Sequence, residues 1–302
     1  MALLVSLVGS SLLLLFFLPY PYDESLSLIL NKISMLTRTP SPRLIVVGGS
    51  GSYSGIDSPM LKEKLGFNIV NLGLYAGFGI LPLLDIVSDH LNPNDVVFII
   101  PEYGVMLNGF ENDEKARKWL LAADPRRRIQ LYGFNKIGIT ELFKDVSELS
   151  RSKLAVFPKS IFRVPSQGYV KAKKILNEYG DLKESFHKAA PGQLEGKGSA
   201  LTFQFSNDPI NKLNAFSQFG KDRGVNVYFI FPAFPQSEYE LNKVEIDALS
   251  RRLNGSLQFP MLGKPQDFLY PEDCFLDTTN HLNGAGKKMR TERIISLFKM
   301  QN

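Results

Sequence analysis

The chain has 302 residues, of which 44% are hydrophobic and 22% are charged, a composition that excludes a largely disordered protein. The formal net charge of +5 suits an anionic membrane surface or polymer, but no nucleic-acid-binding motif occurs, so we expect no nucleic-acid partner. The single cysteine, Cys274, excludes an internal disulfide and a cysteine-rich metal site. The three histidines lie far apart in the sequence, so we expect neither a metal nor another cofactor.

The first part of the chain has the character of a membrane segment. Residues 2–18 carry no charge, and Tyr20 and Tyr22 follow them. At about 1.5 Å per residue such a helix just crosses a thin bilayer, and tyrosines suit its interface. We therefore expect residues 1–22 to be an N-terminal membrane anchor, with the rest of the protein on the extracytoplasmic side. A cleaved signal peptide, which would need a basic start, and a buried helix are the alternatives.

Residues 23–42 are expected to be a juxtamembrane linker with one amphipathic stretch, closed by the Thr-Pro-Ser-Pro run at 39–42. From residue 43 the pattern alternates between apolar runs and helical segments. The predicted strands are Leu44–Val47, Phe67–Leu72 and Asp95–Ile100, and the predicted helices are 58–65 and 81–91. Continuous apolar strands between helices predict a parallel sheet that is covered on both faces.

The alternation stops over about residues 101–208, where helix-like pieces and an arginine cluster at 126–128 predict a helical insertion or lid. It then resumes with helices at about 209–223, 237–253 and 284–300, the last capped by Asn283, and with strands at 225–231 and near 256–259. We therefore expect residues 43–302 to form one α/β domain, a three-layer α/β/α sandwich with about five parallel strands.

The first strand ends in Gly48-Gly49-Ser50, where glycines allow a tight turn and close approach of a substrate to the serine. An ordinary strand-to-helix turn is one alternative. A loosened dinucleotide-binding loop is another, but that motif expects an acidic residue after the second strand, where this chain has Asn71. It also expects a helix at once, whereas residues 52–58 are predicted to be a loop.

A second candidate segment lies just before the last helix. Asp277 precedes His281 by four residues, so the acid can orient one ring nitrogen while the other faces Ser50. A serine becomes a good nucleophile when a histidine accepts its proton and an acid holds that histidine. A surface histidine that packs against the helix is the alternative for His281.

These segments together resemble the SGNH/GDSL hydrolase superfamily, which has a flavodoxin-like fold. The resemblance covers about residues 43–300 and rests on Gly48-Gly49-Ser50, on the turn from Asn71 to Gly77, and on Asp277 with His281. It is closest to the membrane-anchored branch of cell-envelope polymer acylation, including alginate acetylation proteins and the D-alanine transfer protein of teichoic acids. It implies that the site residues include Asn71, Gly73 and a backbone donor to the oxyanion at Gly77 or Ala76.

The chain departs from the family's pattern in three places. The acid usually lies three residues before the histidine rather than four, so Asp273 is an alternative to Asp277. The turn after the second strand is one residue longer than usual. The third strand leads into Glu102 instead of an oxyanion-binding asparagine, for which Asn108 is a distant candidate. An ionised glutamate only accepts hydrogen bonds, so Glu102 in that form cannot replace the asparagine.

Three roles are open to Glu102 at the sheet edge. The candidate roles are to bind a sugar hydroxyl, to orient His281 or to pair with an arginine of the insertion. The alternative is that Glu102 is a solvated acid in a loop with no role in the site. The whole pattern predicts a serine esterase or O-acyltransferase that acts on a cell-surface polysaccharide or another acylated glycan, in partnership with the membrane and a membrane-bound O-acyltransferase. The alternative is a catalytically weak scaffold that binds glycan or such an acyltransferase.

Overall fold

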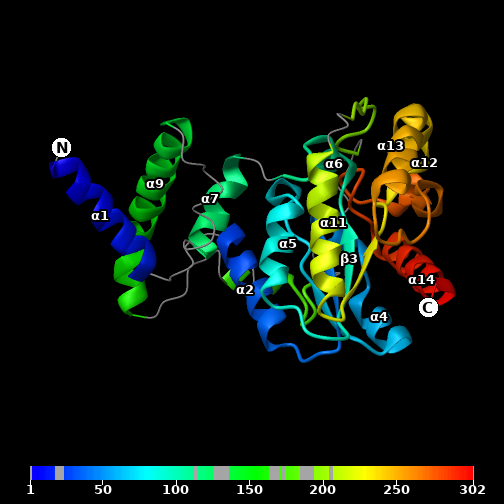
Figure 1. The fold of residues 1–302 in the computed structure, drawn as a ribbon, viewed down its shortest axis with the longest axis horizontal. Helices are drawn as coiled ribbons and strands as arrows, with labels where there is room; N and C mark the ends of the chain where they lie inside the picture. The colour runs from blue at the N-terminus through cyan, green and yellow to red at the C-terminus, as the bar shows by residue number, and fades with distance from the viewer. Residues whose placement is uncertain are drawn as a thin grey trace. The chain divides into compact units, whose positions relative to one another are not determined.

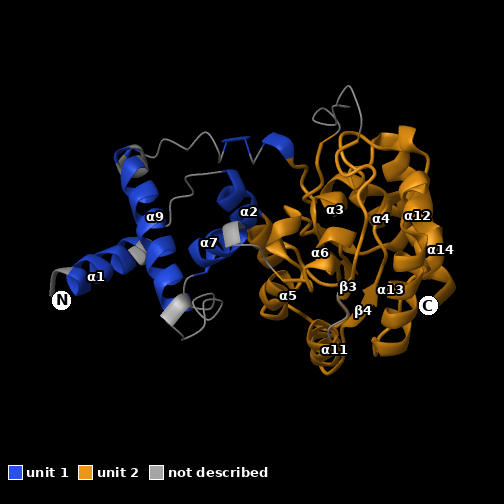
Figure 2. Cartoon of the chain, turned by 90° about the horizontal axis from the view of Figure 1, so that it is seen from above, with its two compact units in different colours: residues 1–31, 113–175 blue, residues 32–112, 176–302 orange. Residues whose placement is uncertain are grey.

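The computed structural model describes residues 2–17, 24–111, 114–124, 136–162, 170–171, 174–183, 194–203 and 207–301. The chain forms two compact units (Figure 2). Unit 1 comprises residues 1–31 and 113–175, and unit 2 comprises residues 32–112 and 176–302. The arginine cluster at 126–128 and the tyrosines at 20 and 22 lie outside the described residues.

Unit 2 is built on a four-stranded parallel sheet with the order β2-β1-β3-β4. The strands are β1 (Arg43–Gly48), β2 (Asn68–Asn71), β3 (Val96–Ile100) and β4 (Asn226–Phe229). Every residue of β1 and β3 is buried, as expected for strands that are covered on both faces. The structure thus confirms the predicted α/β fold and its parallel sheet.

The prediction of about five strands is wrong for the described residues. The expected strand at 256–259 begins inside helix α13 (Lys243–Ser256), and only Met261 forms a parallel bridge to Phe229. Pro260, immediately before it, accepts a hydrogen bond from Phe229 but has no N–H to donate, and Gly263 turns away with a φ of +81°. The fifth position of the sheet is therefore a single bridge rather than a strand.

Helices cover both faces of this sheet (Figures 1 and 2). Helices α5 (Leu81–Ser88) and α11 (Asp208–Lys221) contact each other on one face. The other face carries α14 (Gly284–Gln301), which contacts both α3 (Ser50–Gly55) and α4 (Ser58–Leu65). The predicted loop at 52–58 is wrong, because α3 begins directly at Ser50.

The remaining elements of unit 2 are short or lie at its edges. They are η1 (Ala76–Phe78), α6 (Tyr103–Leu107), α12 (Gln236–Leu241), η4 (Pro265–Phe268), η5 (Glu272–Cys274) and the two-stranded pair β5 (Phe234–Pro235) and β6 (Leu269–Tyr270). The helix predicted at 237–253 is two helices that meet at Asn242. Asn283 caps α14 as predicted, since its Oδ1 accepts the Gly286 N–H at 3.1 Å.

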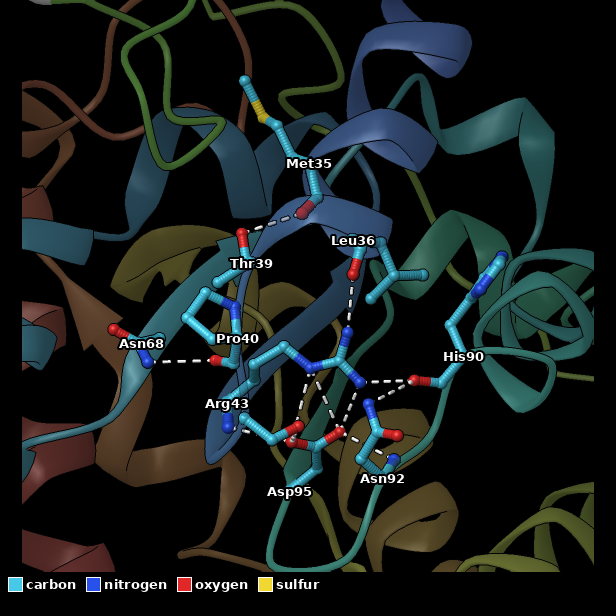
Figure 3. A network of polar contacts seen from close by, with 10 residues as sticks. Met35, Leu36, Thr39, Pro40, Arg43, Asn68, His90, Asn92 and Asp95 are labelled. Carbon is cyan, nitrogen blue, oxygen red and sulfur yellow. Dashed lines mark hydrogen bonds and ion pairs between the residues drawn. The ribbon is translucent and has the colours of Figure 1, made fainter.

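A buried ion pair fixes the amino edge of the sheet (Figure 3). Arg43, at the start of β1, donates from Nη2 to Asp95 Oδ2 at 2.5 Å and from Nε at 3.1 Å. Its remaining donors reach the carbonyls of Leu36 and His90. Asp95 also accepts the backbone N–H of Asn92 and of Arg43. Both charges are therefore satisfied by partners on α2 (Glu24–Arg38), β1 and the turn before β3.

Unit 1 is helical and contains α1 (Ala2–Phe17), α7 (Glu114–Ala123), α9 (Lys136–Ile161) and the first residues of α2. Leu121, Val146 and Leu149 form a small core, and Ser150 donates to the Ser11 carbonyl of α1. The predicted insertion is helical at α6, α7 and α9, but its described residues 176–183 and 194–203 form turns and isolated bridges. The segment predicted as a linker is largely α2.

No helix within the described residues is both long enough and apolar enough to cross a membrane.

Candidate active site

The carboxyl edge of the sheet brings Ser50 and Glu102 together. Strands β1 and β3 are paired up to Gly48 and Ile100, which lie opposite each other. Ser50 and Glu102 each follow that last pair by two residues, and Ser50 Oγ lies 3.4 Å from Glu102 Oε1. Polar groups at this edge of an open parallel sheet are the usual place for a ligand or substrate.

A hydrogen-bonded chain joins the three residues predicted to be catalytic. Ser50 Oγ lies 2.8 Å from His281 Nε2, and His281 Nδ1 lies 2.8 Å from Asp277 Oδ1. Both distances fall in the range of about 2.6–3.2 Å that proton transfer requires. The structure therefore places a serine, a histidine and an aspartate in the same hydrogen-bonded order as in a serine hydrolase triad.

A tight loop explains why a four-residue spacing still joins Asp277 to His281. The loop is closed by an antiparallel bridge between Phe275 and Leu282, and the Leu276 N–H donates to the His281 carbonyl. Glu195 pairs with the loop on its other side, where its N–H donates to the Asp277 carbonyl at 2.8 Å. The backbone on both sides of the acid and the histidine is thus fixed.

The nucleophile turn depends on its glycines. A Cβ at Gly49 would lie 2.6 Å from Glu102 Oε1, and a Cβ at Gly51 would lie 2.8 Å from the Asn280 carbonyl. The absence of side chains therefore allows Glu102 and the histidine loop to approach Ser50. On α14, Arg290 Nη1 donates to the Gly51 carbonyl at 2.9 Å and holds the first turn of α3.

Glu102 is buried, which excludes the alternative of a solvated loop acid. Only 5% of its surface is exposed, and its Oε1 accepts the Gly51 N–H at 2.5 Å. Burial raises the pKa of the Glu102 carboxyl, while the Gly51 N–H, the nearby His281, the Ser50 hydroxyl and the Arg290 guanidinium act to lower it. Glu102 was also predicted to pair with an arginine of the insertion. Among the described residues, the arginine near this carboxyl is Arg290, which lies on α14.

Asn71 and Gly73 position the nucleophile turn from β2. The side chain of Asn71 accepts the Gly73 N–H at 2.9 Å and donates to the Ser52 carbonyl at 3.1 Å. A Cβ at Gly73 would lie only 2.6 Å from the Tyr53 nitrogen, so Gly73 packs directly against α3. Both residues thus contact the backbone of α3, the helix that begins at Ser50.

Asp181 supports this region and was not predicted. Its carboxylate accepts hydrogen bonds from Ser58 Oγ at 2.6 Å, Asn71 Nδ2 at 2.8 Å and Asn177 Nδ2 at 3.1 Å. Lys32 lies nearby, fully buried, and donates to the carbonyls of Asn71 and Gly180; burial lowers its pKa to about 7, while the charge of Asp181 acts to raise it. The turn residues Asn177 to Asp181 were the available signal in the sequence.

Four other candidates have no described contact with the triad. Ala76 and Gly77 lie in η1, where hydrogen bonds run from Phe78 to Tyr75 and from Gly79 to Ala76. Asn108 ends α6 and donates its N–H to the Gly104 carbonyl. Asp273 lies in η5, and its carbonyl accepts from Asn283 Nδ2. Asp277 thus contacts His281 in place of the alternative acid.

The triad is open to solvent on the side of its acid. The side chain of Asp277 is 46% exposed and that of His281 is 21% exposed. Within the described residues, solvent therefore reaches the side chains of the histidine loop. In the described ranges, no group of three or more His, Cys, Asp or Glu side chains is arranged to hold a metal ion.

No protein-family model matches this chain, and no curated protein matches it. The structure itself shows a parallel α/β sheet flanked by helices, with Ser50, His281 and Asp277 hydrogen-bonded to one another at its carboxyl edge.

Proposed function

We propose that the protein is a serine esterase or O-acyltransferase of the SGNH type that works through an acyl-serine intermediate. The observation that carries the proposal is the hydrogen-bonded chain from Ser50 through His281 to Asp277, with both links at 2.8 Å. A nucleophile, a base and an orienting acid in this arrangement are the parts that acyl transfer needs.

In the proposed reaction, Ser50 Oγ forms a bond to the acyl carbon while its proton passes to His281 Nε2. The carbonyl electrons move to the carbonyl oxygen, where the backbone N–H groups of Ser50 and Gly77 are candidate donors. The intermediate then collapses, the bond to the leaving alcohol breaks, and His281 returns the proton to that alcohol. Asp277 holds the Nδ1 proton and stabilises the imidazolium.

A second half-reaction releases the acyl group. Water or a sugar hydroxyl attacks the acyl-serine, His281 removes the proton of the attacking group, and Ser50 leaves. Ester hydrolysis and O-acyl transfer differ only in that acceptor. The open side at Asp277 supports a polymeric substrate, for which we propose a cell-surface polysaccharide or another acylated glycan.

The uncharged helix α1 supports a place at the membrane surface. The extracytoplasmic side, and a membrane-bound O-acyltransferase as a neighbour, rest on the resemblance to proteins of envelope-polymer acylation. The net charge of +5 favours an anionic surface or polymer as the partner. These assignments of location and partner form part of the proposal.

A fluorophosphonate probe tests the proposal, because it reacts with activated serines. We expect the full-length chain to be labelled once, with peptide mass spectrometry locating the adduct on Ser50, and we expect it to hydrolyse p-nitrophenyl acetate. Labelling at another serine with Ser50 unmodified would contradict the assignment.

Asp277→Asn should lower kcat for p-nitrophenyl acetate by about 10²–10⁴-fold, because an amide can hold the imidazole in the wrong tautomer. The lower end of this range reflects the exposure of Asp277, where water competes for His281 Nδ1. Asp273→Asn is the matched control, since Asp273 contacts Asn283 through its carbonyl, and it should retain activity within about threefold. Equal losses in the two variants would exclude Asp277 as the orienting acid.

A catalytically weak scaffold is the second candidate. The buried Glu102 beside Ser50 favours it, because an ionised carboxylate there would oppose the negative charge that forms during attack. Such a scaffold would bind glycan or a membrane acyltransferase. Wild-type protein that neither reacts with the probe nor hydrolyses the ester would support this candidate over the enzyme.

A further inference from the structure

The hydroxyl of Ser50 has one proton to donate and two neighbouring groups that can accept it. His281 Nε2 lies at 2.8 Å and Glu102 Oε1 at 3.4 Å. The proposed mechanism requires the tautomer in which His281 Nδ1–H donates to Asp277; Nε2 is then an acceptor, and the Ser50 proton points to it. No serine proton then remains for Glu102. Ser50 Oγ and Glu102 Oε1 then face each other without a hydrogen between them, and this contact is more costly when Oε1 shares a negative charge than when the carboxyl is neutral.

Burial is the largest influence on Glu102 and favours its neutral form, although the groups around the carboxyl act in the opposite direction. Its carboxyl faces the Gly51 N–H, the Ser50 hydroxyl, the His281 ring and the Arg290 guanidinium. Arg290 donates its described hydrogen bond to the Gly51 carbonyl and forms no ion pair with the carboxyl. A buried carboxylate without a hydrogen-bonded cation is costly, so the neutral acid is preferred.

The two carboxyl oxygens of Glu102 have different environments. Oε1 accepts the Gly51 N–H at 2.5 Å, whereas Oε2 forms no hydrogen bond with any described residue. A carboxylate oxygen would accept the same bond, but in a neutral acid the oxygen that accepts it is the carbonyl oxygen, because the other oxygen carries the proton. The acidic proton therefore belongs on Oε2, which is available to a group bound beside Ser50.

We infer that Glu102 is a further catalytic residue, a neutral carboxylic acid whose Oε2–H donates a hydrogen bond to the oxyanion that forms when Ser50 attacks an ester. The inference rests on the proposed function. Glu102 keeps its proton throughout: the serine proton goes to His281, the carbonyl electron pair goes to the oxygen, and Glu102 supplies a hydrogen bond only. It thereby provides the donor that an ionised glutamate lacks.

Two variants of the full-length chain separate the neutral donor from other roles. Glu102→Gln keeps the shape and a donor at every pH, whereas Glu102→Leu removes the donor. With p-nitrophenyl acetate, we expect Glu102→Gln to retain kcat within about tenfold and Glu102→Leu to lose about 10²–10³-fold, the usual effect of one oxyanion donor. Circular dichroism and the thermal midpoint would show that both variants are folded.

The pH profile gives a second readout. Burial raises the pKa of Glu102, so the wild-type acid stays neutral above its ordinary range and loses its proton as the pH rises further. We expect wild-type kcat to fall on the alkaline side for this reason, and Glu102→Gln to lack that fall. A fall of the same size in both proteins would overturn the inference.

Infrared difference spectroscopy supplies a readout that needs no turnover. The wild-type spectrum minus that of Glu102→Gln at neutral pH should contain the C=O stretch of a protonated carboxylic acid, which shifts in D₂O. Two results would overturn this inference and leave the proposed function standing, provided that the protein is still labelled at Ser50. One is the absence of this band, and the other is an equal loss of kcat in the Gln and Leu variants. A wild type that is neither labelled nor active overturns the proposed function, and the role of Glu102 with it.

Discussion

Ser50→Ala is expected to lower kcat for p-nitrophenyl acetate by about 10⁴–10⁶-fold, because it removes the only atom of the triad that bonds to the substrate. Its Oγ lies 2.8 Å from His281 Nε2, and the alanine methyl group leaves the fold unchanged. The measurement is the initial rate over a range of ester concentrations, with the thermal midpoint recorded for each variant.

Ser52→Ala is the matched control for this experiment. Ser52 is buried two residues along the same helix, and its hydroxyl donates only a long bond of 3.4 Å to the Ile100 carbonyl. It should retain kcat within about threefold. The double variant of Ser50 and His281 should be no slower than Ser50→Ala, since the two residues act as one unit. A further additive loss would mean that His281 acts separately from Ser50.

Asp95→Asn is expected to lower the free energy of unfolding by about 3–5 kcal/mol, because it leaves the buried charge of Arg43 without its counter-ion. Arg43 is 2% exposed and Asp95 is fully buried, so water cannot replace the lost partner (Figure 3). Urea denaturation followed by circular dichroism would show a lower midpoint with an unchanged slope.

Two further variants locate the origin of that loss. Arg43→Met combined with Asp95→Asn removes both charges but keeps an amide oxygen for the backbone N–H groups of Asn92 and Arg43, and it should recover part of the stability that Asp95→Asn loses alone. Lys64→Met removes one member of an exposed ion pair with Glu63 and should cause little measurable change. If Asp95→Asn proved as mild as Lys64→Met, the ion pair would not stabilise the amino edge.

Local patterns in the sequence were sufficient to predict the strands of the sheet. Apolar runs such as Leu44–Val47, bounded by turn residues, bury all their side chains when they form the strands of a parallel sheet that is covered on both faces. The structure places β1 to β4 where such runs occur. The predicted fifth strand failed because its strand character was weak and Pro260 cannot pair on both sides.

The sequence by itself determined which residue types are available: a serine after the first strand, and an acid and a histidine before the last helix. Only the tertiary structure decided that Ser50 meets His281 at 2.8 Å, because 231 positions separate them and no local periodicity encodes such a distance. It also decided the state of Glu102. A glutamate is expected to be solvated, and it becomes a buried carboxyl with a raised pKa beside Ser50 only because β3, α3 and α14 pack around it.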